Sequence, residues 1–264
     1  YKERADEEED IVVTNEEAML LKDKSAMLIV VDVNLPAMTE CPELLKSVST
    51  IVVLDHHRQN TETIKNAVVS YVEPYASSTW EMVAEILQYI VDKPKLKNIE
   101  ADAMYSGILV DTDNFVIQAG VRTFEAAAFL RRAGADVTRV RKMFREDMEH
   151  CRIRTAIINK AEIYMDEFAI STFDGANVSG ATVVGAKAAN ALLNIQGIRG
   201  SFVLTSLQDC IYISARSIDE LNVQVIMEKF NGGGHLTMAA AQLKDVTLEE
   251  AKQQLEDVLQ QMRE

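Results

Sequence analysis

The stretch Ile51-Val-Val-Leu-Asp-His-His57 decides the fold, because four apolar residues lead directly into an acid and two imidazoles. Two other apolar runs end in a similar way: residues 27–31 precede Asp32, and residues 107–110 precede Asp111. Continuous apolar runs of this kind are typical of strands buried on both faces, as in a parallel sheet. The sequence therefore predicts three parallel strands, each followed by an aspartate.

The polar residues at these strand ends are predicted to share one crevice. Ligands of open α/β sheets gather outside the carboxyl ends of the strands, so three carboxylates and two imidazoles should converge there. Carboxylate oxygen and imidazole nitrogen together suit a divalent ion such as Mn²⁺. The alternative is that His56 and His57 are a surface residue and a capping residue, and the preceding strand argues against it. The donor set thus predicts metal-assisted hydrolysis.

The bulk composition is that of a soluble globular protein. A length of 264 residues allows two domains, and 48% hydrophobic with 26% charged residues is ordinary for this class. No apolar run approaches the roughly 20 residues of a membrane span, and no signal-peptide pattern begins the chain. The widely spaced Cys41, Cys151 and Cys210 are expected to be reduced thiols.

The net charge of −14 excludes long nucleic acids as partners, since proteins that bind them usually carry a basic stripe. A small phosphate compound held by metal ions is compatible with this charge, because local cations dominate the field in such a site. Part of the acidity lies in Asp6-Glu-Glu-Glu-Asp10, which we expect to be a solvated edge.

The first half of the chain has the pattern of βαβ units. Strand-like and helix-like segments alternate over residues 27–135, and residues 101–109 are helix-like, leading into a short strand before Asp111. Ser78-Thr-Trp-Glu81 predicts a capping box at the start of one helix, and residues 123–133 predict a second helix. Residues 136–165 predict one long polar helix that connects two domains, with the boundary inside it near residue 150.

Beyond this helix the order of elements changes. The sequence predicts strands at 168–172, 201–205 and 210–215, the last two paired around a turn, and helices at 185–195, 222–229 and 248–262. The predicted fold is therefore an α/β protein: a parallel-sheet domain of residues 1–149, joined by the long helix to a smaller mixed-sheet domain of residues 150–264.

A second candidate site is the stretch Asn231-Gly-Gly-Gly-His235. Consecutive glycines let backbone N–H groups approach an anion, and the histidine after them can bind a phosphate. The alternative is a plain loop that ends a helix after Phe230. Arg216 and Ser217, at the end of a predicted strand, are candidates for a phosphate grip, and Asn222 either contacts the substrate or caps its helix.

Ser77, Ser78 and Thr79 are candidate nucleophiles by residue type alone. No base stands next to them in the sequence, so helix capping is the favoured interpretation.

The order of these motifs resembles one known superfamily. The motifs are Val31-Asp32, Asp55-His56-His57, Glu73-Pro-Tyr-Ala-Ser-Ser-Thr79, Val110-Asp111-Thr112 and Asn231-Gly-Gly-Gly-His235. They are similar to those of the DHH/DHHA1 phosphoesterases over residues 25–260, and within that superfamily to the cytosolic phosphodiesterase region of membrane-anchored cyclic-di-AMP phosphodiesterases. The resemblance implies that residues 1–149 form the DHH metal-binding catalytic domain and residues 150–264 the DHHA1 substrate-binding domain.

The resemblance also implies roles for single residues. Asp32 would bridge two Mn²⁺ ions, and His56 and Asp111 would ligate one of them. Asp55 would support the site from behind, and His57 would hold or protonate the scissile phosphate. The implied substrate-binding residues are Arg216, Ser217, Asn222, Gly232, Gly233, Gly234 and His235.

One motif of the superfamily is missing from this sequence. The family's first motif, a His with two Asp upstream of the position of Asp32, supplies most ligands of one metal, whereas no histidine here precedes His56. We therefore expect one Mn²⁺ in this chain, through Asp32, His56 and Asp111, where the intact parent holds two. The chain is predicted to be catalytically impaired, and its first domain less stable, because the missing segment would carry a sheet strand.

The implied reaction is hydrolysis of cyclic-di-AMP to linear pApA by a metal-activated water. The alternatives are a hydrolase of nanoRNA or 3′-phosphoadenosine phosphate, and a nucleotide-binding module without catalysis. The expected partners are a cyclic or short linear dinucleotide and, from the resemblance, a second copy of the chain. The parent is expected on the cytoplasmic side of the cell membrane, anchored through segments that this sequence lacks.

Overall fold

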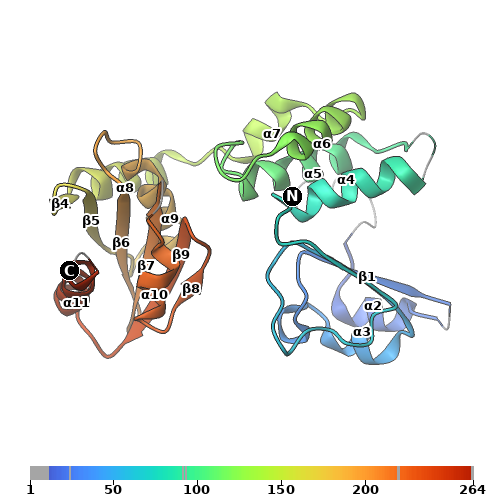
Figure 1. Cartoon of the computed structure of the whole chain (residues 1–264), viewed down its shortest axis with the longest axis horizontal. Helices are drawn as coiled ribbons and strands as arrows, with labels where there is room; N and C mark the ends of the chain where they lie inside the picture. The colour runs from blue at the N-terminus through green and yellow to red at the C-terminus, as the bar shows by residue number, and fades with distance from the viewer. Residues whose placement is uncertain (1–11, 24, 91, 93, 219–220, 263–264) are drawn as a thin grey trace. The chain divides into compact units, whose positions relative to one another are not determined.

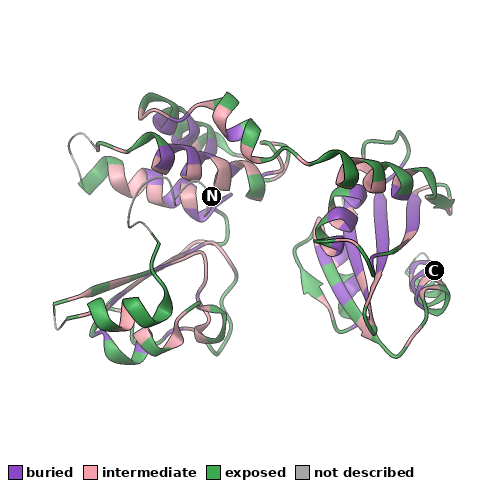
Figure 2. Cartoon of the chain, turned by 180° about the vertical axis from the view of Figure 1, so that it is seen from behind, coloured by how far each residue is buried: buried purple, intermediate pink, exposed green. Residues whose placement is uncertain are grey.

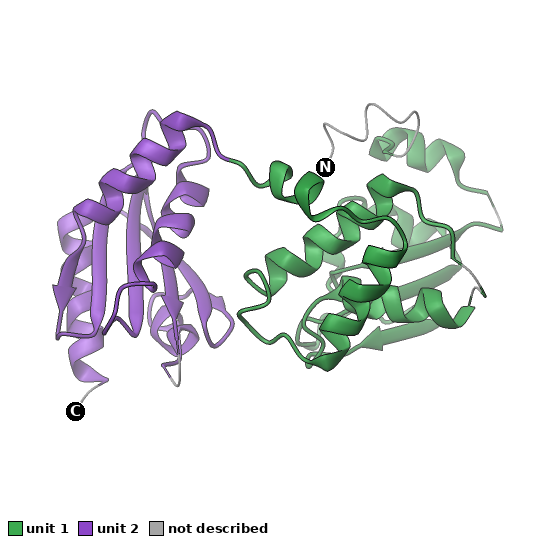
Figure 3. Cartoon of the chain, turned by 90° about the horizontal axis from the view of Figure 1, so that it is seen from above, with its two compact units in different colours: residues 1–145 green, residues 146–264 purple. Residues whose placement is uncertain are grey.

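The computed structural model describes residues 12–23, 25–90, 92, 94–218 and 221–262. The chain divides into two compact units, Tyr1–Arg145 and Glu146–Glu264, which Figure 3 shows in different colours. The acidic run at residues 6–10 lies outside the described residues. No helix in the described part of the chain has both the length and the apolar character needed to cross a membrane.

The first unit contains a parallel sheet with strand order β1-β2-β3. Its strands are β1 (Met27–Val31), β2 (Thr50–Asp55) and β3 (Val69–Val72), so the first two apolar runs form neighbouring strands as predicted. One face packs on a small core with Leu45 and Ile64. Short helices lie along this part of the chain: α2 (Asn15–Leu21), η1 (Pro36–Met38) and α3 (Pro42–Ser47).

The third apolar run forms a helix, so the prediction of a strand at residues 107–110 was wrong. The run ends α5 (Asn98–Asp111), in which Ile108 is buried while Val110 is mostly exposed. A β-carbon at Gly107 would lie 2.0 Å from the Trp80 ring, so the glycine lets α5 approach the neighbouring helix. Four apolar residues fit a buried strand and the inner side of a helix equally well.

Helices make up the rest of the first unit (Figure 1). α4 (Thr79–Ile90), α5 and α6 (Val121–Arg132) pack around a shared core that includes Met104, Ile108 and Leu130. Buried Asp102 in α5 accepts hydrogen bonds from Asp136 N, at 2.8 Å, and from Arg139 Nε, at 2.7 Å. These bonds hold α7 (Val137–Met143) against α5.

The predicted long helix over residues 136–165 is also wrong. The structure has two helices there, α7 and α8 (Met148–Asn159), followed by strand β4 (Glu162–Tyr164). The side chains of Asp136 and Asp147 accept hydrogen bonds from Arg139 N and His150 N, so each begins a helix of its own. Asp147 is an N-cap in the middle of a polar stretch, where amphipathic periodicity alone gives no boundary.

The second unit contains a mixed sheet with strand order β4-β5-β6-β7-β9-β8. β5 (Phe168–Asp174) and β6 (Gly200–Leu207) are parallel; β6 and β7 (Cys210–Ser217) form the predicted antiparallel pair. β9 (Met238–Lys244) pairs antiparallel with β7 and with the short β8 (Gly233–Gly234).

Helices cover both faces of this second sheet. α8 and α9 (Ala181–Leu192) pack on one face around Ala169 and Val203. α10 (Val223–Glu228) and α11 (Leu248–Gln261) pack on the other around Phe202 and Ile213. Alternate residues of β5 and β6 therefore enter two separate cores, and the central strands β5, β6 and β7 are buried along most of their length (Figure 2).

Candidate metal centre

The ends of β1 and β2 bring an aspartate and two histidines together. Because the two strands are parallel neighbours with Val31 opposite Leu54, the residues that follow them emerge at the same sheet edge. Asp32 extends the ladder, with its N–H donating to Leu54 O at 2.9 Å, and then adopts a left-handed conformation with φ of 68°. Such a backbone is unfavourable for a residue other than glycine and is typical of functional sites.

Asp32, His56 and His57 each offer one ligand atom, and these three atoms lie within 4.8 Å of one another. His56 Nε2 lies 3.6 Å from Asp32 Oδ1. The His56 side chain is 12% exposed and that of Asp32 is 48% exposed. The cluster is therefore anchored in the protein on one side and open to an ion and its substrate on the other.

The hydrogen bond of His56 fixes which ring nitrogen is available. Its Nδ1 lies 3.2 Å from Ala76 O. A carbonyl can only accept, so Nδ1 carries a proton, and in the neutral imidazole the lone pair is on Nε2, which lies 3.6 Å from Asp32 Oδ1. This is the arrangement in which an outer carbonyl orients a metal-binding histidine.

Asp55 supports His57 from a fully buried position. Its Oδ1 accepts from His57 Nδ1 at 2.7 Å and from His57 N at 3.2 Å, and Oδ2 accepts from Asn34 Nδ2 at 2.5 Å. Burial acts to raise the pKa of Asp55, but the bonds from His57 and Asn34 outweigh it and the pKa lies below its usual value. The hydrogen bond to Asp55 in turn raises the pKa of His57.

Asn34 is a site residue that sequence reasoning missed. It is buried, and besides Asp55 it binds His57 O at 3.3 Å. The available signal was an amide two residues after Asp32, at the end of the first strand.

Asp111 enters the site from the end of a helix. Burial raises the pKa of Asp111 and the charge of Asp32 adds to this effect, while a hydrogen bond with Ser78 and the attraction of His56 act in the opposite direction. Asp111 is therefore within electrostatic reach of the cluster. The ligand atoms that lie together belong to Asp32, His56 and His57, and the role of Asp111 as a ligand stays a prediction.

Residues 76–79 surround the cluster with hydrogen-bonding groups. Thr79 Oγ1 donates to Asp32 Oδ1 at 2.9 Å. Ser78 Oγ accepts from Trp80 N at 3.2 Å, which agrees with the capping interpretation, and its hydroxyl also bonds Asp111. The capping box is not formed as predicted, because Glu81 Oε2 accepts from Ser77 Oγ and Thr123 Oγ1 instead.

The glycine stretch lies in the second unit and builds a hairpin. A β-carbon on Gly232 would lie 2.2 Å from Ala240 O, and one on Gly234, with φ of +148°, would lie 2.4 Å from Met238 O. Gly233 has open space around it and is exposed. Asn231, with φ of 55°, adopts the left-handed conformation that commonly follows the end of a helix. The glycines after it are therefore not needed to end α10.

His235 closes this hairpin, with its N–H donating to Met238 O at 2.7 Å, and is exposed. Two neighbouring candidates have structural partners: Ser217 Oγ donates to Leu221 O at 2.7 Å, and Asn222 caps α10 by accepting from Gln224 N at 3.0 Å. Arg216 Nε donates to Asn190 Oδ1 at 2.6 Å. Substrate contacts by these residues and by the three glycines stay predictions.

Comparisons with known proteins agree with this architecture. Residues 3–108 match the DHH family, N-terminal domain, and residues 170–264 match the DHHA1 domain. The chain is 45% identical to the cyclic-di-AMP phosphodiesterase PdeA of Listeria monocytogenes and 44% identical to the cyclic-di-AMP phosphodiesterase GdpP of Geobacillus thermodenitrificans. Both alignments cover 92% of this chain, which spans 37% of the length of each relative.

Among solved structures, the chain is similar to an exopolyphosphatase-related protein from Bacteroides fragilis. The TM-score is 0.79 at 20% identity, over 99% of this chain and 75% of the other. This likeness concerns the fold. The chain belongs to the DHH/DHHA1 superfamily, in which a DHH domain is followed by a DHHA1 domain.

Proposed function

We propose that this chain is the catalytic part of a metal-dependent phosphodiesterase that hydrolyses cyclic-di-AMP to linear pApA. The observation that carries the proposal is the cluster of Asp32, His56 and His57, whose ligand atoms lie within 4.8 Å of one another at the ends of two parallel strands. The names and the 44–45% identity of the two bacterial relatives support the cyclic dinucleotide as substrate.

The donor set fits a divalent ion. Asp32 offers a carboxylate oxygen, and His56 offers an Nε2 whose lone pair is free because Nδ1 bonds Ala76 O. Hard and borderline ions such as Mn²⁺ take this combination. When bound, such an ion lowers the pKa of a water molecule and neutralises charge on the phosphate. We propose Asp32 and His56 as its principal holders, with Asp111 as a further ligand.

His57 and Asp55 would act on the phosphate as a pair. Asp55 Oδ1 accepts a hydrogen bond from His57 Nδ1 and so stabilises the protonated imidazole, in agreement with the raised pKa of His57. A protonated His57 can donate a hydrogen bond to a phosphoryl oxygen, or a proton to the leaving oxygen. Asn34 holds the other oxygen of Asp55 and keeps the carboxylate in this orientation.

The exposed stretch around Gly233 is the proposed contact for the substrate in the second unit. A backbone that is exposed and has no β-carbon can bring its N–H groups close to a phosphate. The net charge of −14 favours a small ligand over a long polyanion. Membrane anchoring and dimerisation of the parent stay predictions.

The test is Mn²⁺-dependent hydrolysis of cyclic-di-AMP, with pApA as a parallel substrate, by this chain and by a chain lengthened to the size of its relatives. We expect the longer chain to produce pApA and the Asp32→Asn variant to lose that activity. Faster cleavage of pApA than of the cyclic compound would favour the hydrolase of short linear oligonucleotides, and no cleavage would favour a binding module.

A further inference from the structure

Three residues at the candidate metal centre, His56, Asp32 and Asp111, are each hydrogen-bonded to one short segment, residues 76–79. Ala76 O accepts from His56 Nδ1, and Thr79 Oγ1 donates to Asp32 Oδ1. Ser78, between them, bonds Asp111. A shift of this segment would therefore displace several candidate metal ligands at once.

The segment is itself held by a buried carboxylate that does not belong to the ligand cluster. Glu81 is 2% exposed, and its Oε2 lies 2.5 Å from Ser77 Oγ and 2.6 Å from Thr123 Oγ1. Ser77 Oγ and Thr123 Oγ1 are 3.0 Å apart, and Thr123 Oγ1 accepts from Gly120 N at 3.0 Å. This buried network connects residues 76–79 to the first turn of α6.

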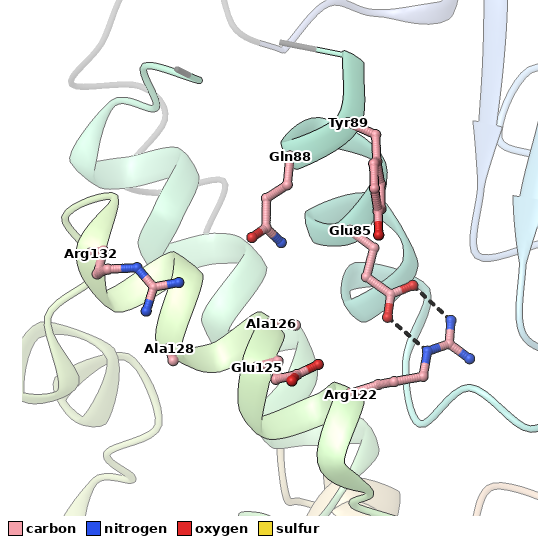
Figure 4. Close-up of a pocket in the computed structure, with 8 residues that line it drawn as sticks. All are labelled: Glu85, Gln88, Tyr89, Arg122, Glu125, Ala126, Ala128 and Arg132. Carbon is pink, nitrogen blue, oxygen red and sulfur yellow. Dashed lines mark hydrogen bonds and ion pairs between the residues drawn. The ribbon is translucent and has the colours of Figure 1, made fainter. Parts of the chain in front are cut away.

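Arg122, beside Thr123, forms ion pairs with one glutamate before residues 76–79 and with one glutamate after them. Its guanidinium binds Glu73 at 2.5 Å and Glu85 at 2.7 Å, and the two hydrogen bonds to Glu85 are visible in Figure 4. Arg122 is partly exposed, so solvent weakens these ion pairs. The buried hydroxyls and Glu81 are the stronger constraint, because buried polar groups lose much more when a partner is removed.

We propose that Glu81 and Thr123 are positioning residues of the metal centre: they fix residues 76–79, and through them the spacing of the metal ligands. The inference rests on the proposed metal-dependent function. Its physical basis is that a metal site requires its ligand atoms to be held within about 0.5 Å, so the groups that hold the ligands contribute to affinity.

The experiment measures the Kd for Mn²⁺ by electron paramagnetic resonance titration, well below the unfolding temperature of each variant. We expect Thr123→Val to weaken Mn²⁺ binding about tenfold, the lower end of the range for groups that orient metal ligands. Thr123→Ser, which keeps the hydroxyl, should bind as wild type. Thr205→Val is the matched control, because Thr205 is buried in the second unit and its hydroxyl has no hydrogen-bond partner among the described residues.

Ser77→Ala removes the other hydroxyl group that donates to Glu81, with little change in side-chain volume. This variant therefore tests the positioning role if Thr123→Val does not fold. Wild-type Kd values in Ser77→Ala and in folded Thr123→Val would overturn the inference and leave the metal centre standing. A wild-type chain that binds no Mn²⁺ would overturn the proposed metal centre and this inference with it. A lower unfolding temperature at unchanged Kd would assign the network a structural role only.

Discussion

The two sheets of this chain differ in how completely their faces are covered. In the second unit both faces pack against helices, and Ile213 in β7 is 0% exposed. In the described part of the first unit, only one face of the sheet packs on a core. The other, which we call the open face, carries Met27, Ile29, Val69 and Tyr71, and its Ile29 is 54% exposed.

The better covered sheet and the candidate site lie in different units of the chain. Parallel sheets are usually covered on both faces. The open face therefore leaves apolar area of the first unit in water, whereas the second unit buries apolar area on both faces of its own sheet. The candidate metal centre nevertheless lies at the edge of the less covered sheet, where Asp32 follows β1, and Asp55 and the two histidines lie at the end of β2. We infer that the first unit gains its site from strand geometry and hydrogen bonds, while the second unit supplies the more stable fold.

The largest expected effect comes from matched isoleucines in the two sheets. Ile213→Ala should lower the free energy of unfolding of the second unit by about 2–5 kcal/mol, because Ile213 is fully buried. Ile29→Ala should lower that of the first unit by less than about 1 kcal/mol, because about half of the Ile29 side chain is already exposed to solvent. Urea unfolding can separate the units, because Trp80, the single tryptophan, reports on the first by fluorescence while circular dichroism follows both. Equal costs at the two positions would contradict the contrast between the sheets.

The next effect concerns the metal centre. Asp32→Asn keeps the shape of the side chain and its ability to accept from Thr79, but removes a charged ligand. We expect Mn²⁺ affinity to fall by more than about 100-fold, the upper end for groups that only orient ligands. Asp113→Asn, in the turn after α5, is the control and should bind as wild type. Similar affinities for both variants would place the ion elsewhere.

A smaller effect is expected in the glycine hairpin of the second unit. Gly233→Val fits the open space around this residue, so the unfolding transition should not move. If the backbone there contacts a phosphate, affinity for cyclic-di-AMP should fall about tenfold, as expected when a hydrogen bond to a charged group is lost. Equilibrium dialysis measures this change. Unchanged affinity would remove the hairpin from the substrate site, whereas a lowered unfolding midpoint would assign it a structural role.

The smallest effect is a pH dependence in the second unit. The hydrogen bond to Ser179 O, together with that to Asp147, raises the pKa of His150 above its usual value. A histidine whose pKa is raised by folding contributes stability that is full below its unfolded pKa and is lost as pH rises through the folded value. The urea midpoint of the second unit should therefore fall more in wild type than in His150→Gln as the pH rises above the unfolded pKa of about 6.5. Parallel midpoints in the two proteins would contradict this role of His150.

Sequence alone determined the place where candidate site residues directly follow two neighbouring parallel strands. The apolar runs before Asp32 and Asp55 identify two parallel strands, and the ends of parallel neighbours meet at one edge, so the meeting of Asp32 with His56 follows from the sequence. The hairpin of β6 and β7 follows in the same way from local alternation and a polar turn.

Only the tertiary structure decided the elements whose local signal is ambiguous. The run before Asp111 is helical because one of its sides packs against the core formed with α4 and α6, a choice that four apolar residues cannot encode. The roles of Asn34, Ser78 and Thr79 were likewise hidden, since each acts on a residue at least 21 positions away in the chain or across an element. Hydrogen bonds of this kind exist only after strands and helices pack, which is why the candidate ligands could be predicted from the sequence and the groups that orient them could not.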